Sequence, residues 1–167
     1  MLGRLALTTT FVFLAGSAAI AAVPKSLGTF ENWSAWVYRE DGRARCYIYS
    51  TPISKTPPRL DHGDISFFVR ATPQGASRTE ANLQAGYAFA PGSTVRADIG
   101  EESFQLMVQE QNAWLPTADQ EDNLLAAMRG GEKMTIAATS KRGNTTGYVF
   151  SLEGVTAAMR RIQTSCP

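Results

Sequence analysis

The chain has 167 residues, which is enough for one domain and short for two. Its 16 basic and 15 acidic side chains give a formal net charge of +1, which argues against a nucleic-acid-binding protein and against a polybasic membrane-surface protein. A single histidine and two cysteines exclude a multi-histidine zinc site, a zinc finger and a dense disulfide scaffold.

The first segment has the pattern of a secretory signal peptide. Arg4 supplies the positive charge, residues 5–16 are mostly apolar, and Ala19-Ile20-Ala21 is a small-x-small cleavage site. We therefore expect residues 1–21 to be removed and residues 22–167 to form a single domain, periplasmic or secreted. No later stretch approaches the length of a transmembrane helix, so no transmembrane segment is expected after cleavage.

Short alternating runs separated by turn residues predict an antiparallel β domain. The predicted strands span residues 33–39, 44–50, 65–72, 81–87, 94–99, 103–109, 133–140 and 145–152. The proline-containing segment 51–63 is expected to be an irregular surface loop.

Two segments change to a helical period. Residues 117–129 begin with Thr117-x-x-Gln120, which fits a capping box, and are followed by Gly130, so a short helix is predicted there. A C-terminal helix is predicted over residues 154–166, with one apolar face formed by Val155, Ala158, Met159, Ile162 and Cys166.

Cys46 and Cys166 are the only cysteines, and export to an oxidising compartment favours a disulfide between them. A reactive thiol is the alternative, but no histidine flanks either cysteine and neither lies in a CxxC motif. The predicted disulfide would join the C-terminal helix to an early strand, 120 residues apart in the chain.

No constellation of catalytic side chains stands out, and we predict a protein with no enzymatic activity, no metal and no cofactor. The chain has no GxSxG and no glycine-rich phosphate-binding motif. His62, between Asp61 and Asp64, is interpreted as part of a polar turn with Gly63 at positive φ. The competing hypothesis is a hydrolase that uses carboxylates of residues 52–64, with His62 as the base.

Two basic pairs are the candidate partner-binding residues. Lys141 and Arg142 lie at a predicted hairpin tip, and Arg160 and Arg161 lie on the polar side of the last helix. Such cations suit an acidic partner or the phosphates of a surface lipid, whereas their structural interpretation is a solvated turn and helix face.

Aromatic side chains occur on both faces of two predicted strands. Tyr47, Tyr49 and Phe68 point opposite to their apolar neighbours, which indicates either a two-sided core or a binding face. We interpret them as core. The three tryptophans, Trp33, Trp36 and Trp114, are likewise interpreted as core or strand-end packing.

The order of these motifs resembles the invasion-associated locus B family of exported alphaproteobacterial proteins. The resemblance is carried by Trp33, Cys46-Tyr47, Gly63-Asp64, Phe67-Phe68-Val69, Ala85-Gly86-Tyr87-Ala88-Phe89, Pro91-Gly92-Ser93-Thr94-Val95, Phe104, Ala113-Trp114, Ala126-Ala127-Met128, Thr139-Ser140-Lys141-Arg142-Gly143, Tyr148, Ser151-Leu152-x-Gly154, Ile162 and Cys166.

The resemblance implies an immunoglobulin-like β-sandwich in the periplasm or envelope, and it supplies no catalytic residues. The family is named for members linked to the entry of pathogens into red blood cells. We expect a non-enzymatic module that binds an unknown envelope protein or an anionic envelope component. The alternatives are a small-ligand carrier with a cavity between the sheets and the hydrolase described above.

Overall fold

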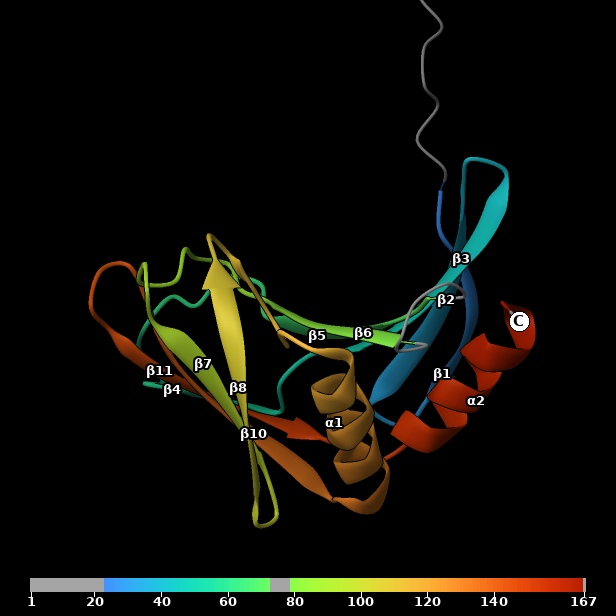
Figure 1. Ribbon diagram of the computed structural model, residues 1–167. Coiled ribbons are helices and arrows are strands. Elements are labelled where there is room, and N and C mark those ends of the chain that lie inside the picture. Colours follow the sequence, from blue (N-terminus) through green and yellow to red (C-terminus); the bar gives the residue numbers. More distant parts are fainter. Residues whose placement is uncertain (1–22, 73–78, 167) are drawn as a thin grey trace, which may run out of the picture.

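The computed structural model describes residues 23–72 and 79–166, which fold into eleven strands and two helices (Figure 1). The predicted signal peptide, residues 1–21, lies outside the described residues. The elements are β1 Lys25–Phe30, β2 Trp33–Glu40, β3 Arg43–Ser50, β4 Ser54–Thr56, β5 Ser66–Ala71, β6 Thr79–Gln84, β7 Thr94–Ile99, β8 Glu102–Gln109, β9 Asn112–Trp114, α1 Ala118–Gly130, β10 Lys133–Thr139, β11 Thr145–Ser151 and α2 Val155–Ser165.

The described strands form one hydrogen-bonded sheet in the order β1-β2-β3-β5-β6-β9-β8-β7-β10-β11-β4. Every neighbouring pair in it is antiparallel, so the prediction of a mainly β, antiparallel domain is confirmed. The strands β1, β4 and β9 were not predicted from the sequence. Two of them, β4 and β9, have only three residues each, too few for an alternating pattern to stand out.

The sheet bends so that its two ends face each other across one core. Phe67 of β5 and Phe150 of β11 pack edge to face with ring centroids 6.0 Å apart. The indole Nε1 of the buried Trp33 in β2 donates to the carbonyl oxygen of Ser151 in β11 at 3.0 Å. These contacts make two facing layers, as in a β-sandwich.

The two helices begin and end within a residue of their predicted bounds. At the start of α1 the hydroxyl of Thr117 accepts a hydrogen bond from the backbone N–H of Gln120, as the capping pattern predicts. Helix α1 packs against β6 and β8, and α2 packs against β1, β2 and β3 (Figure 1). In the described ranges, residues 23–72 and 79–166, no helix is long and apolar enough to cross a membrane.

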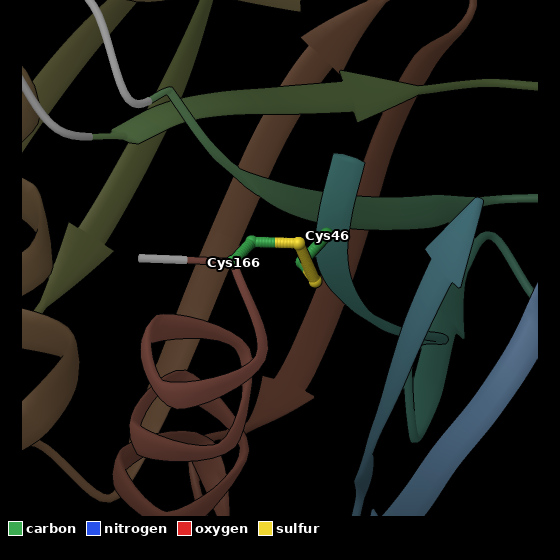
Figure 2. The surroundings of a disulfide bond; sticks show 2 residues. All are labelled: Cys46 and Cys166. Carbon is green, nitrogen blue, oxygen red and sulfur yellow. A yellow bond between two sulfur atoms is a disulfide. The ribbon is translucent and has the colours of Figure 1, made fainter. Parts of the chain in front are cut away.

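The predicted disulfide is present and ties the end of the chain to the sheet. Cys166 directly follows α2, Cys46 lies in β3, and their Cα atoms are 5.9 Å apart (Figure 2). Both residues are buried. The bridge therefore anchors α2 against the inner side of β1–β3.

Most residues of the segment 51–63 are exposed, as the prediction of a surface loop requires, but the segment is less irregular than predicted. Residues 54–56 form β4, an edge strand paired with β11. Near the end of the segment His62 is buried, with 5% of its surface exposed. Prolines interrupt a strand pattern locally, but they do not prevent a loop from packing on its neighbours.

Candidate functional site

Rings gather on the outward side of the half-sheet formed by β2, β3, β5 and β6. Because side chains alternate along a strand, Cys46, Ile48 and Phe67 face the core while their neighbours Tyr47 and Phe68 face outward. The cross-strand register continues this row of outward residues through the pairs Trp36–Tyr47, Tyr49–Phe68, Tyr47–Arg70 and Phe68–Asn82. We call the outward side of these four strands the aromatic face.

The rings on the aromatic face contact one another. Tyr49 and Phe68 are stacked with centroids 5.6 Å apart, and Tyr47 lies 6.0 Å from Phe68. Tyr38 packs edge-on against Tyr47 at 6.0 Å. Burial raises the pKa of the Tyr47 phenol, and the neighbouring Tyr49 and Tyr38 raise it further.

The interpretation of these rings as a two-sided core is wrong. Tyr47, Tyr49 and Phe68 are half-buried and lie outside the core cluster, because both helices and the opposite layer pack on the inner side of the sheet. Of the tryptophans, Trp33 is in the core as predicted. Trp36 is half-buried on the aromatic face, and its indole N–H has no hydrogen-bond partner among the described residues.

A groove of about 320 Å³ lies on the aromatic face. It is lined by Tyr38, Tyr47, Phe68, Arg70, Glu80, Asn82 and Gln84. Rings from β2, β3 and β5 form one part of the lining, and polar side chains of β5 and β6 form the rest. The one guanidinium is ion-paired with the one carboxylate, Arg70 with Glu80, and the hydrogen bond between them raises the pKa of Arg70. Among the described residues that line it, the groove is apolar in one part and polar in the other and carries no net charge.

A second groove, of about 310 Å³, lies below the hairpin that joins β10 and β11. Its lining comes from three separate segments: Leu60, Asp61, Gly63, Gly86, Tyr87, Ala88, Ser140, Lys141, Arg142, Asn144 and Thr146. The cations predicted to bind a partner, Lys141 and Arg142, are both exposed there. We call this the hairpin groove.

A chain of buried and part-buried hydrogen bonds runs behind the hairpin groove. Nε2 of His62 lies 2.9 Å from the carbonyl oxygen of Pro57, and since a carbonyl only accepts, Nε2 carries a proton. Nδ1 of His62 lies 3.0 Å from the hydroxyl of Tyr148. That hydroxyl lies 2.9 Å from the hydroxyl of Tyr87, which lies 2.6 Å from Oγ1 of Thr146. Burial raises the pKa of Tyr148, and the hydrogen bond with Tyr87 raises it further.

The contacts of His62 are those of a residue that holds the fold together. Both ring nitrogens contact groups of the protein itself, and the imidazole is not part of the lining of either groove. Gly63 has φ +60°, as the turn interpretation predicts. No cluster of three or more metal-ligating side chains is present in the part of the chain that the structure describes.

Close backbone packing fixes the loop that carries His62. A Cβ atom at Gly86 would lie 2.7 Å from both the Asp64 nitrogen and the Gly63 Cα, closer than real Cβ atoms come to such neighbours. Only glycine at position 86 lets the two segments approach this closely. The same approach brings Tyr87, the next residue, to the hairpin groove.

The structure does not bring the two predicted basic pairs together. The hairpin with Lys141 and Arg142 and the helix α2 with Arg160 and Arg161 lie at opposite ends of the molecule (Figure 1). Nε of Arg161 donates to the carbonyl oxygen of Leu27 in β1 at 3.2 Å, so that guanidinium helps to hold α2 on the sheet. A single basic surface formed by the four residues is excluded by this separation.

The sequence left the aromatic face open as an alternative, and the preferred interpretation of its rings as core was wrong. Its signal was present: apolar or aromatic residues at both the odd and the even positions of residues 46–49 and 67–68. That pattern cannot tell a strand buried on both sides from one with a ring-bearing outer side, because the choice depends on what packs there.

The chain is similar to proteins of a known family: the family model described as invasion associated locus B (IalB) protein matches residues 33–163. Among solved structures, a crystal structure of invasion associated protein B from Bartonella henselae matches with a TM-score of 0.63. The two sequences are 16% identical, and the match covers 86% of this chain and 97% of that chain. A comparison with curated proteins gave no match.

Proposed function

The chain belongs to the invasion-associated locus B family, since the family model covers most of its length, and from that premise we propose that it is a non-enzymatic binding module of the cell envelope. We propose export on the basis of residues 1–21, which have the pattern of a secretory signal peptide. The partner is an envelope component that presents an acidic group.

The hairpin groove is the site that we assign to this partner. The observation that carries the proposal is the pair of exposed cations at its rim: Lys141 and Arg142 take part in none of the ion pairs among residues 23–72 and 79–166. An acidic group docking there would gain charge-assisted hydrogen bonds without first breaking an internal pair.

The wall of the groove is held in place before a partner arrives. Tyr87 and Thr146 line it and belong to the buried hydrogen-bond chain that ends at His62. A wall that is already ordered loses little conformational entropy on binding, which favours affinity.

The hydrolase and the carrier are less well supported. A general base needs a nitrogen free to reach its substrate, whereas both ring nitrogens of His62 contact protein groups. A carrier needs space between the layers, where Phe67 and Phe150 are in ring contact. The immunoglobulin-like arrangement is likewise part of this proposal, supported by the antiparallel strands and the two facing layers.

Crosslinking pull-downs from the native envelope test the proposal. The variant Lys141→Gln/Arg142→Gln removes both rim cations, and the matched control Arg129→Gln/Lys133→Gln removes two exposed cations away from the groove. We expect the wild type and the control to capture the same acidic component, and the rim variant to lose it at unchanged stability.

Equal capture by all three proteins would contradict the assignment of the groove. A small molecule that co-purifies with the wild type and is visible in native mass spectrometry, without any macromolecular partner, would favour the carrier instead. Fractionation of the tagged protein tests its location in the envelope separately.

A further inference from the structure

The aromatic face has features that the fold itself does not require. Its rings are half-buried and do not belong to the core cluster, and three of them, Tyr38, Tyr47 and Phe68, line the groove. A groove lined by aromatic side chains together with a few polar groups is typical of a ligand site. The charges and polar groups of the groove determine which kind of ligand matches it.

The charges in the groove argue against an ionic occupant. Arg70 and Glu80 are paired with each other, so the described residues that line the groove present no net charge to a phosphate, a carboxylate or an ammonium group. A nucleic acid or an anionic lipid headgroup would need unpaired cations at this place. The occupant that matches is electrically neutral.

The polar residues of the groove argue for a ligand rich in hydroxyl groups. Asn82 and Gln84 occupy alternate outward positions of β6, and each amide has donors and an acceptor. Hydroxyl groups also donate and accept, so they match such a wall better than a hydrocarbon chain does. Beside the amides, the rings offer flat faces of negative potential, on which the C–H edges of a sugar ring stack.

The dimensions agree with a short stretch of sugar chain. The ring centroids of Tyr47 and Phe68, which both line the groove, lie 6.0 Å apart on neighbouring strands. The groove volume of about 320 Å³ lies at the lower end of the range for small-ligand sites, about 300–1,000 Å³. A groove of this volume accommodates a small ligand and is too small to be the contact surface for a whole protein.

We propose that the aromatic face binds a neutral oligosaccharide, the sugar chain of an envelope glycan, by stacking on Tyr47 and Phe68 and by hydrogen bonds to Asn82 and Gln84. This site is separate from the hairpin groove. The two proposals therefore stand or fail independently.

The test is a titration of the mature, disulfide-bonded protein, followed by two-dimensional amide NMR. The probes are neutral tetrasaccharides of β-1,4-linked N-acetylglucosamine, glucose and mannose, and an anionic tetragalacturonate. We expect at least one neutral probe to bind in the millimolar range or more tightly and to shift amides of β2, β3, β5 and β6.

Variants separate stacking from simple loss of structure. Phe68→Ala and Tyr47→Ala are expected to weaken binding about tenfold or more, whereas Tyr47→Phe, which keeps the ring, retains it. Asn82→Ala leaves every ring in place and is expected to weaken binding severalfold, which keeps the test decisive if a ring variant folds poorly. The hairpin variant Lys141→Gln/Arg142→Gln should bind the sugar as the wild type does.

Three results would overturn the proposal. The first is no shift with any neutral probe at about 10 mM. The second is tighter binding of the anionic probe or shifts confined to the hairpin groove. The third is a protein partner whose capture is lost in Phe68→Ala while no sugar binds, since this would make the aromatic face a protein interface.

Discussion

The two outward faces of the same sheet differ in what they carry. On β2, β3 and β5 the outward positions hold rings, as Tyr47, Tyr49 and Phe68 exemplify, and β6 places Asn82 and Gln84 beside them. On β7, β8 and β10 most outward positions hold polar or small side chains, among them Arg96, Asp98, Ser103, Gln105, Thr135 and Ala137. Met107 of β8, which is 45% exposed, is an apolar exception. We call this second surface the polar face.

The inward positions of the two halves are alike, since both alternate buried apolar residues into the one core. An antiparallel sheet needs an apolar side only where it packs on the core, and its other side is commonly polar and faces water. The polar face follows this common pattern. The rings of the aromatic face are therefore additional to what folding requires, and this is why we connect them with binding.

The largest expected effect comes from removing the disulfide bond between Cys46 and Cys166, on the core side of the aromatic half of the sheet. Cys46→Ala/Cys166→Ala opens a loop of 120 residues, and chain entropy predicts a loss of up to about 5 kcal/mol in unfolding free energy. Urea denaturation measures it. Hydrogen exchange should rise first in β1–β3 and α2 and later in β7 and β10.

The control for this prediction is a reducing agent, which should destabilise the wild type and leave the double variant unchanged. Uniformly faster exchange across both halves of the sheet would mean that the bridge does not support the aromatic half in particular.

Two adjacent phenylalanines of β5 give the sharpest contrast between core and face. Phe67 is fully buried, so Phe67→Ala is expected to cost about 3–5 kcal/mol. Phe68 lies on the aromatic face, and Phe68→Ala should cost about 1 kcal/mol. Parallel urea titrations compare them, and similar losses would show that the ring of Phe68 serves the fold after all.

A buried carboxyl group links α1 to β6, one of the four strands of the aromatic face. Oε2 of Glu121 accepts the backbone N–H of Ala81 at 2.9 Å, and burial raises the pKa of Glu121 from 4.5 to about 7. The folded state therefore binds this proton more tightly than the unfolded state does. The stabilisation is complete below pH 4.5 and is lost as the pH rises through 7.

The variant Glu121→Gln keeps an oxygen for the N–H of Ala81 and removes the titration. Between pH 5 and pH 8 we expect the wild type to lose about 2 kcal/mol relative to this variant. Urea denaturation of both proteins at the two pH values provides the measurement. Parallel pH profiles would rule out a raised pKa at this position.

The smallest effects are expected on the polar face. Gln105→Ala and Thr135→Ala remove exposed side chains, and each should change the unfolding free energy by less than about 0.5 kcal/mol. Sugar binding should also be unaffected. A loss of binding in either variant would remove the distinction between the two faces.

Local patterns predicted much of the fold. Alternation located β7 at its observed bounds, and a capping residue located α1 within one residue. These features could be predicted because each rests on neighbours within a few positions of the chain. The strand β9 could not be predicted, because its three residues are too few for an alternating pattern. They form a strand because they pair with β6 on one side and β8 on the other.

The candidate sites were harder to predict. His62 was interpreted as part of a polar turn, and contacts with Tyr148, 86 positions away in the sequence, bury it. The spatial relation of the two basic pairs could not be predicted, and the fold separates the hairpin from α2 (Figure 1). Contacts of this kind depend on long-range packing and leave no local periodicity.

The sequence by itself determined the strand and helix periods, the pairing of its only two cysteines and the family to which the chain belongs. Each of these follows from local spacing, from counting or from the order of motifs. Only the tertiary structure decided that the rings on the second side of β3 and β5 lie outside the core. In the sequence Tyr47 and Phe68 are as apolar as their core-facing neighbours, and packing of α2 and β11 on the other side of the strands left these two rings outward.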